Sequence, residues 1–165
     1  MPVIQYHVYR SHGTTEEELL ATVSGLDTYY NDTDVENDVT YTYRIQAETA
    51  FGKGEITGPF TATPDGTPPS VTIINPAKGT VINESSIIIE WEARDTIIGS
   101  GLKSVFLTLD GNEPQDVTES DTLNIENLTS GEHRIFIEAF DNVGNLFSES
   151  RSFIIDLDDP SVSIE

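Results

Sequence analysis

Short runs of alternating hydrophobic and polar residues dominate the chain, and glycine, proline, asparagine or aspartate bounds each run. In the segment 41–47, Tyr, Tyr, Ile and Ala occupy every second position, and the segments 86–93 and 133–139 alternate in the same way. A period of two is the side-chain period of a β-strand. The one helix-like stretch, residues 14–20, spans about two turns, which is marginal for an isolated helix. The pattern predicts an all-β chain of antiparallel β-sandwiches.

One segment of the chain recurs near its end. PPSVTIINP begins at Pro68, and a partial copy, DPSVSIE, begins at Asp159. Alignment of Pro69 with Pro160 gives an offset of 91 residues (160 minus 69). Because an immunoglobulin-like sandwich has about 100 residues, this offset predicts tandem sandwich domains.

Two proline-containing segments, 65–70 and 156–161, are interpreted as joints, since proline stiffens a linker and cannot donate to a β-ladder. The prediction is a partial domain at 1–64, a β-sandwich at 65–158, and a linker with the first strand of a following repeat at 159–165. A natural chain rarely stops one strand into a domain. We therefore expect the sequence to be a fragment of a longer protein.

The first domain resembles a fibronectin type III domain from its strand C to its strand G. IQYHVYR at 4–10 begins the resemblance, which extends over residues 3–64. Tyr41 takes the place of the family's tyrosine corner, a buried ring whose hydroxyl returns to the backbone. Gly52 and Gly54 match the glycines of the F–G turn. The family's first two strands have no counterpart, so the resemblance implies that half of one sheet is open.

The second domain is similar to the immunoglobulin-like repeats of bacterial and archaeal surface and secreted proteins. The similarity covers about residues 65–160, and the run from Gly131 to Asn145 is its most specific part. His133 stands where Tyr41 stands in the first domain. The matching pieces are TPPSVTIINPAKGTVI, IIIEWEARD, GSGLKSVFLTLDG, SGEHRIFIEAFDNVGN and SFIIDLDDP. The two resemblances together imply tandem immunoglobulin-like and fibronectin type III-like sandwiches.

Charge and composition exclude several classes of partner. The 165 residues include 29 acidic and 8 basic ones, a formal charge of −21, and this field repels nucleic acids and anionic membranes. No apolar run approaches the roughly 20 residues that cross a bilayer. The absence of cysteine removes disulfides, thiolate nucleophiles and sulfur metal sites.

Catalysis is not expected, because an enzyme needs a nucleophile or an acid–base pair held against a base or a metal. The three histidines are His7, predicted on the outward face of a strand, His12, in a loop, and His133, at a corner. No nucleophile elbow, zincin motif or phosphate-binding glycine loop occurs.

Calcium is the chemical alternative, because hard oxygen ligands are plentiful. Carboxylates that converge at a domain boundary repel each other unless a cation lies among them. Surface charge that only keeps the chain soluble is the competing interpretation. The candidate ligands are Asp156, Asp158 and Asp159 in the second joint, Asp65 beside the first, and Asp95 and Asp141 near a domain end.

The acidic segment NDTDVEND at 31–38 begins like an EF-hand loop, with Asp32 and Asp34 two residues apart. Asn37 stands at the position of the loop's glycine, and Tyr43 at that of its bidentate glutamate. We therefore interpret this segment as a solvated loop between strands E and F.

Two kinds of surface site are further candidates. Phe106, Phe136 and Phe140 are predicted to point outward from one sheet of the second domain, where Ile154 could widen their row. Such a stripe can stack on sugars or dock a protein, unless a neighbouring domain or loop covers it. N-x-S/T sequons for glycosylation lie at Asn31, Asn83 and Asn127.

The function predicted from these features is non-catalytic: spacer or adhesion modules of a larger secreted or cell-surface prokaryotic protein. Its partners would be proteins or polysaccharides at the cell surface and neighbouring repeats of the same chain. The alternative is an accessory region, binding carbohydrate or protein, of an extracellular hydrolase.

Two structural expectations follow. Trp91 should be buried against Val105, Leu107, Ile135 and Ile137, which share the inward parity of their strands. The open sheet of the first domain should accept a strand from another chain, such as the tail 159–165, by strand exchange.

Overall fold

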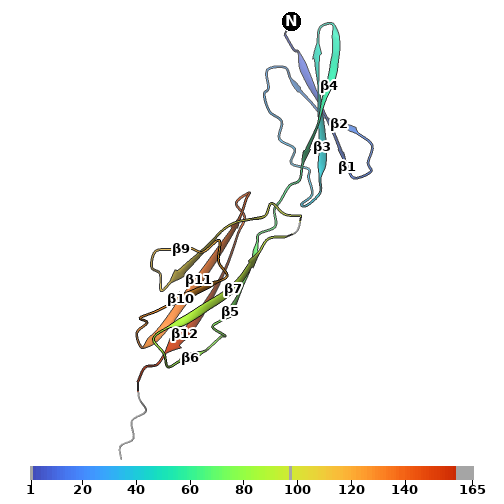
Figure 1. Cartoon of the computed structure of the whole chain (residues 1–165). Helices are drawn as coiled ribbons and strands as arrows, with labels where there is room; N and C mark the ends of the chain where they lie inside the picture. Colours follow the sequence, from blue (N-terminus) through green and yellow to red (C-terminus); the bar gives the residue numbers. More distant parts are fainter. Residues whose placement is uncertain (1, 97, 159–165) are drawn as a thin grey trace, which may run out of the picture. The chain divides into compact units, whose positions relative to one another are not determined.

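The computed structural model describes residues 2–96 and 98–158. The chain divides into two compact units, Met1–Gly66 and Thr67–Glu165 (Figure 1). Every regular element within the described residues is a β-strand, in agreement with the predicted all-β class. None of the described segments forms a helix long and apolar enough to span a membrane.

The first unit is a single antiparallel sheet with the strand order β2-β1-β3-β4. Its strands are β1 (Gln5–His12), β2 (Glu18–Ser24), β3 (Tyr41–Thr49) and β4 (Gly52–Ala62). Residues 25–40 contain no strand. The polar groups of this segment bind side chains of the sheet instead, so the unit has one layer.

The first unit has almost no hydrophobic core. Tyr6 pairs with Ala47 and Val8 with Ile45, so these residues line one face of the sheet. Val8 and Tyr41 are the only buried hydrophobic residues among those described in this unit, against fourteen in the core of the second. Hydrophobic burial alone therefore cannot account for its folding, because small domains are already marginal.

The second unit is a two-sheet sandwich. One sheet has the order β10-β7-β5 and the other β6-β12-β11-β8-β9. All pairs are antiparallel except β6 with β12, which is parallel. The strands are β5 (Ser70–Asn75), β6 (Val81–Ile82), β7 (Ile87–Arg94), β8 (Leu102–Leu109), β9 (Gln115–Asp116), β10 (Thr122–Ile125), β11 (Gly131–Asp141) and β12 (Leu146–Ile155).

The core of the second unit confirms the predicted strand faces. Trp91 on β7 is 2% exposed, and the facing sheet covers it with alternate residues of β8 and β11. Ile88 and Glu90, which alternate with the buried positions of β7, are exposed. The buried partners in the facing sheet include Val105, Leu107, Ile135 and Ile137.

Side chains of β12 protect the outer edge of β5. The guanidinium of Arg151 donates to the carbonyl of Ile73 at 3.2 Å and to that of Pro76 at 3.0 Å, while Glu149 accepts from the Ile73 N–H at 3.4 Å. Arg151 and Glu149 are themselves paired at 2.8 Å. An unpaired strand edge can bind a strand from another molecule. Arg151 and Glu149 instead occupy the free backbone groups of β5 where the two sheets meet.

Replacement of Trp91 by alanine is expected to destabilise the second unit by about 3–5 kcal/mol, because it leaves a large cavity in the core. Thermal or urea unfolding of the full chain measures the loss. Ile88→Ala, on the exposed side of the same strand, is the matched control and should change the stability little. A Trp91→Ala protein that melts within a degree of the parent would contradict the assigned faces.

Candidate functional site

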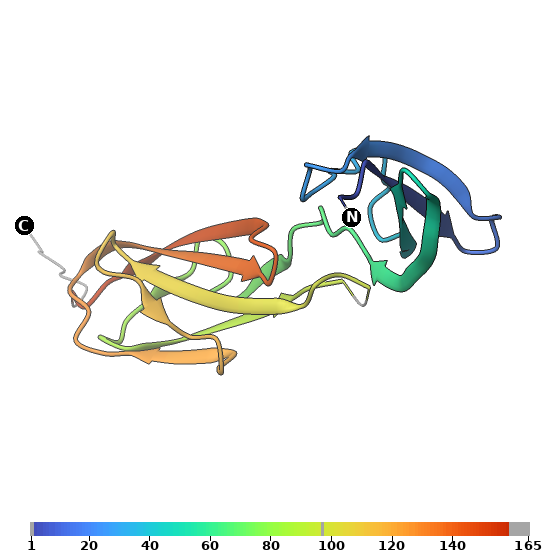
Figure 2. The same cartoon turned by 90° about the horizontal axis from the view of Figure 1, so that it is seen from above.

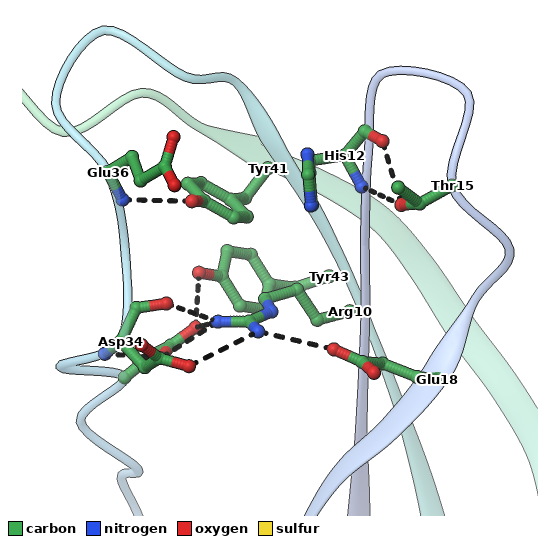
Figure 3. Close-up of polar contacts among 9 residues, drawn as sticks. Arg10, His12, Thr15, Glu18, Asp34, Glu36, Tyr41 and Tyr43 are labelled. Carbon is green, nitrogen blue, oxygen red and sulfur yellow. Dashed lines mark hydrogen bonds and ion pairs between the residues drawn. The ribbon is translucent and has the colours of Figure 1, made fainter.

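A buried arginine occupies the apolar face of the first unit (Figure 3). Arg10, near the end of β1, lies opposite Tyr43 of β3 and is 8% exposed. Its Nη1 donates to both carboxylate oxygens of Asp32, at 3.3 and 3.1 Å, and to the Asp34 carbonyl at 2.6 Å. Its Nη2 donates to Glu18 at 3.2 Å. One cation thus binds the segment 25–40 to the sheet and to β2.

Asp32 is the anionic partner of this cluster. Its side chain is 9% exposed, and the Tyr43 hydroxyl donates to it at 2.8 Å. Burial opposes the charged form, but hydrogen bonds from Tyr43, the Asp34 N–H and Arg10 outweigh burial and hold the pKa of the Asp32 carboxyl below its ordinary value. Burial and the hydrogen bond to Asp32 raise the pKa of Tyr43 to about 12.

The interpretation of 31–38 as a solvated loop is therefore wrong for Asp32. The alternation that puts Arg10 on the apolar face was visible in the sequence, but its partner lies 22 residues away in a segment without periodicity. A basic residue at an inward strand position was the signal that a buried acid had to exist, since buried charges are paired.

The tyrosine corner of the first unit is confirmed. Tyr41 is 3% exposed, and its hydroxyl accepts a hydrogen bond from the Glu36 N–H at 2.9 Å. The Arg10 guanidinium lies 5.3 Å from the centre of the Tyr41 ring, a cation–π distance. Figure 3 shows the corner and the arginine cluster holding the same stretch of chain at two points. Gly52, with φ of 120°, begins β4 in a conformation that favours glycine.

An apolar groove remains on the same sheet face, where the segment 25–40 does not cover it. The groove has a volume of about 380 Å³. A smaller hollow of about 230 Å³ reaches Asp32 and Tyr43 and shares part of the same lining. Residues of three strands form the floor and two tyrosines the wall: Tyr6, Val8, Val23, Ile45, Tyr29 and Tyr30.

The carboxylates near the ends of the second unit have structural partners. Asp141 is fully buried, and its Oδ1 accepts from the N–H groups of Val143, Gly144 and Asn145 at 2.7–3.0 Å. Burial opposes its charge, but the hydrogen bonds from Asn145, Gly144 and Val143 prevail and lower the pKa of Asp141. It therefore shapes the β11–β12 turn.

Asp95 fixes the loop between β7 and β8, accepting from the N–H groups of Thr96 at 2.8 Å and Gly101 at 2.6 Å. One of its oxygens lies within 4.8 Å of one of Asp141. Asp65 belongs to the first unit. The loop and turn therefore meet at the end of the unit where the chain enters, held by their own hydrogen bonds.

The predicted carboxylates of the second joint lie at the opposite end. The Asp158 N–H donates to Asp156 at 3.2 Å, and both side chains are exposed. Asp159 lies outside the described residues. Within the described part of the chain, Asp156 and Asp158 belong to no group of three potential metal ligands. Calcium binding by these residues stays a prediction.

The aromatic residues of β8 and β11 share the outer face of the larger sheet. Phe106 and Phe140 contact each other edge to face, with centroids 6.2 Å apart, and both are half-buried, as is Phe136. Glu138 stands directly across from Phe106. Ile154 pairs with Glu132, four positions along β11 from Phe136, so it does not extend the row.

His7 and His133 are less exposed than the sequence suggests. His7 lies on the face opposite Val8, as predicted, but it is buried, and Glu48, at 2.6 Å, and Thr22, at 3.2 Å, bind its two ring nitrogens. His133 is also buried. His12, expected in a loop, is the last residue of β1. It is exposed beside Tyr41, with 5.2 Å between the ring centres, and its backbone N–H donates to Thr15 at 3.0 Å (Figure 3).

The three sequon asparagines, Asn31, Asn83 and Asn127, are exposed, and none lies within a strand. Asn127 has a φ of 60°, in the left-handed region that asparagine tolerates. Glycosylation at these positions stays a prediction.

Replacement of Arg10 by methionine is expected to release the segment 25–40, because it leaves the Asp32 carboxylate buried without its cation. Loss of one partner of a buried ion pair costs about 3–5 kcal/mol. Amide exchange of Glu36, whose N–H binds Tyr41, measures the release at one residue.

Arg44→Met is the matched control, since Arg44 and its partner Glu17 are both partly exposed, at 40% and 34%. Exposed pairs contribute about 0–1 kcal/mol, so the exchange at Glu36 should stay near that of the parent. Equal exchange in both variants would show that the buried arginine does not hold the segment.

Comparison with known proteins gives one family match. Residues 69–137 match the model of the bacterial Ig domain family. No curated protein matches the sequence.

Two solved structures are similar to parts of the chain. The fibronectin(III)-like modules of CbhA from Clostridium thermocellum align with 16% identity and a TM-score of 0.47, covering 55% of this chain and 100% of that one. The FN1–FN3 domains of chicken CNTN1 align with 18% identity and a TM-score of 0.48, covering 92% of this chain and 55% of that one.

The strand topology agrees with the two resemblances drawn from the sequence, and the family match supports the one for the second unit. The first unit has a four-stranded sheet and a tyrosine corner, and the second unit is a sandwich of two sheets. Domains of these kinds are generally non-catalytic and typically extracellular. The chain is an all-β chain of immunoglobulin-like and fibronectin type III-like modules.

Proposed function

We propose that the chain is a spacer and adhesion segment of a larger secreted or cell-surface protein, without catalytic activity of its own. The observation that carries this proposal is the path of the chain through the second unit. Ser70, at the start of β5, pairs with Arg94, whereas Ile155, at the end of β12, pairs with Gly131. The chain enters this unit at one end and leaves at the other (Figure 1 and Figure 2).

This path makes the unit add its full length to the reach of the protein. The ten residues of β12 span about 33 Å at roughly 3.3 Å per residue. A binding or catalytic domain needs no such separation of its ends, whereas a spacer needs it. The acidic surface keeps such an array soluble.

The same path determines how the unit bears a pulling force. The chain enters through β5 and β6 and leaves through β12, and β6 and β12 are parallel. The Ile154 and Asp156 N–H groups donate across this pair at 2.9 and 2.8 Å. Force applied to the two ends acts along these strands, so it loads the hydrogen bonds together and not one after another.

Single-molecule pulling of the full chain from its two ends tests the spacer function. Asp156→Pro removes the N–H that donates to the Ile82 carbonyl, and one such hydrogen bond contributes about 1 kcal/mol, so unfolding of the second unit at a given load should become about 5- to 10-fold faster. Asp156→Asn keeps the backbone N–H and is the matched control. Equal forces for parent and proline variant, or no mechanical resistance in the parent, would refute a force-bearing spacer.

A second candidate is an accessory polysaccharide-binding region of an extracellular hydrolase, and the aromatic row on β8 and β11 favours it. The half-buried rings of Phe106, Phe136 and Phe140 share one face, with the Glu138 carboxylate between them. Ring faces pack on the apolar faces of sugars, and a carboxylate accepts hydrogen bonds from hydroxyl groups. The formal charge of −21 repels anionic chains, so the ligand would be a neutral polysaccharide.

Pull-down of the full chain on insoluble neutral polysaccharide tests this candidate. Phe136→Ala is expected to lower the bound fraction about tenfold if one stacked ring contributes roughly 1–1.5 kcal/mol. Ile88→Ala, on the outer face of the opposite sheet, should leave binding unchanged. If the parent chain stays in the supernatant, this candidate is excluded and the proposed spacer function is unaffected.

Contact with neighbouring repeats and strand exchange between chains stay predictions. The donor proposed for exchange, residues 159–165, lies outside the described residues. The acceptor would be an edge of the open sheet of the first unit, whose uncovered face carries the apolar groove. Light scattering of the full chain and of a chain lacking residues 159–165 distinguishes exchange from a monomer.

A further inference from the structure

The corner residue of the second unit contacts two hydrogen-bond acceptors. Nδ1 of His133 lies 2.7 Å from a carboxylate oxygen of Asp110, and Nε2 lies 2.9 Å from the Thr129 carbonyl. A carboxylate and a carbonyl can only accept, so both ring nitrogens must carry a proton for both bonds to exist. The geometry fits an imidazolium ion and neither neutral tautomer.

The surroundings of His133 allow this charge to persist. The side chain is 10% exposed, and the ring stacks on Phe153 of β12 at 5.6 Å. Asp110, 36% exposed, is fixed by the neighbouring Arg134, whose N–H donates to its second oxygen at 2.7 Å. The Asp110 charge is therefore held against the ring.

The charged and titratable groups around His133 come from two elements. The β8–β9 turn contributes Asp110. On β11 itself, Glu132 and Arg134 flank the histidine, and the Arg134 guanidinium donates to Ser150 at 2.7 Å. The facing position on β12 is Phe153, which carries no charge. Asp110 is the one titratable side chain bonded to the ring.

The loop that His133 holds also holds the chain where it leaves the unit. Thr129 accepts from His133, and the hydroxyl of the next residue, Ser130, accepts from the Leu157 N–H at 3.1 Å. Leu157 lies two residues after the end of β12, in the second joint. A change at His133 therefore reaches the joint through two adjacent loop residues.

We propose that His133 is a proton-operated latch: its imidazolium binds Asp110 and Thr129 at once, and loss of one proton loosens the loop that anchors the exit segment at Leu157. The latch holds the joint at low pH and loosens it as the pH rises. The hydrogen bond to Thr129, opposed by burial and supported by Asp110, raises the pKa of His133 above its ordinary value, in agreement with this geometry. The stabilisation is complete below the unfolded pKa of about 6.5 and is lost as the pH rises through the higher folded pKa.

Imidazole ¹⁵N NMR of the full chain tests the protonation directly. At pH 6.5 both ring nitrogens of His133 are expected to carry protons, and the midpoint of its titration should lie above 6.5. Asp110→Asn removes the negative partner and keeps an acceptor oxygen, so it should lower this midpoint by about one pH unit. A neutral His133 ring at pH 6.5, or a midpoint that Asp110→Asn leaves unchanged, would overturn the proposal.

Amide exchange of Leu157 between pH 6 and 9, corrected for the intrinsic pH dependence of exchange, tests the connection to the joint. The protection of Leu157 should fall about tenfold as His133 loses its proton, because a pKa change on the order of one unit corresponds to a tenfold change in the opening equilibrium. His133→Gln keeps hydrogen-bonding capacity without a titrating ring, so its corrected protection should be flat with pH, whereas His12→Gln should behave like the parent. Constant protection in the parent refutes the latch, even if His133→Gln does not fold.

Discussion

The buried guanidinium of Arg10 is the interaction on which the first unit depends. It lies on a sheet face that no second sheet covers, and it connects three parts of the chain: β1, which carries it, β2 through Glu18, and the segment 25–40 through Asp32 and Asp34. With two buried hydrophobic residues among those that the structure describes, the unit cannot rely on apolar burial as an ordinary sandwich does. A charged network takes the place of part of the missing layer. The network is most sensitive to the loss of Arg10, because the Asp32 carboxylate, 9% exposed, would then be left buried without its cation.

The second unit solves the same problem in the ordinary way and uses charge only at its ends. Fourteen buried hydrophobic residues fill the space between its sheets. Asp141 and Asp95 fix the loops where the chain enters, and the His133–Asp110 pair fixes those where it leaves. Polar bonds at the ends of a sandwich satisfy the backbone groups of loops that strand pairing cannot reach. The core therefore provides stability, while these side chains fix the geometry of the two places where the chain continues.

Alternation of residue types was enough to predict the strands, their faces and the burial of Trp91, because a period of two is a local property. The place of Tyr41 at a corner was also predictable, since it depends on a fixed position in one strand. The donor to the Tyr41 hydroxyl and the partner of Arg10 were not predictable, because Glu36 and Asp32 lie in a segment without periodicity whose path depends on those same contacts. The acidic composition concealed Asp32 further, as one aspartate among 29 acidic residues carries no distinguishing signal.

The two charged networks respond to pH in opposite directions. The pKa of the Asp32 carboxyl is lowered on folding, so its contribution is present above the unfolded value and is lost as the pH falls through the folded one. The pKa of His133 is raised, so its contribution is present at low pH and is lost as the pH rises. Both contributions are complete only between these limits, in the mildly acidic range. Acid therefore weakens the cluster around Arg10, and alkali weakens the end of the second unit from which the chain continues.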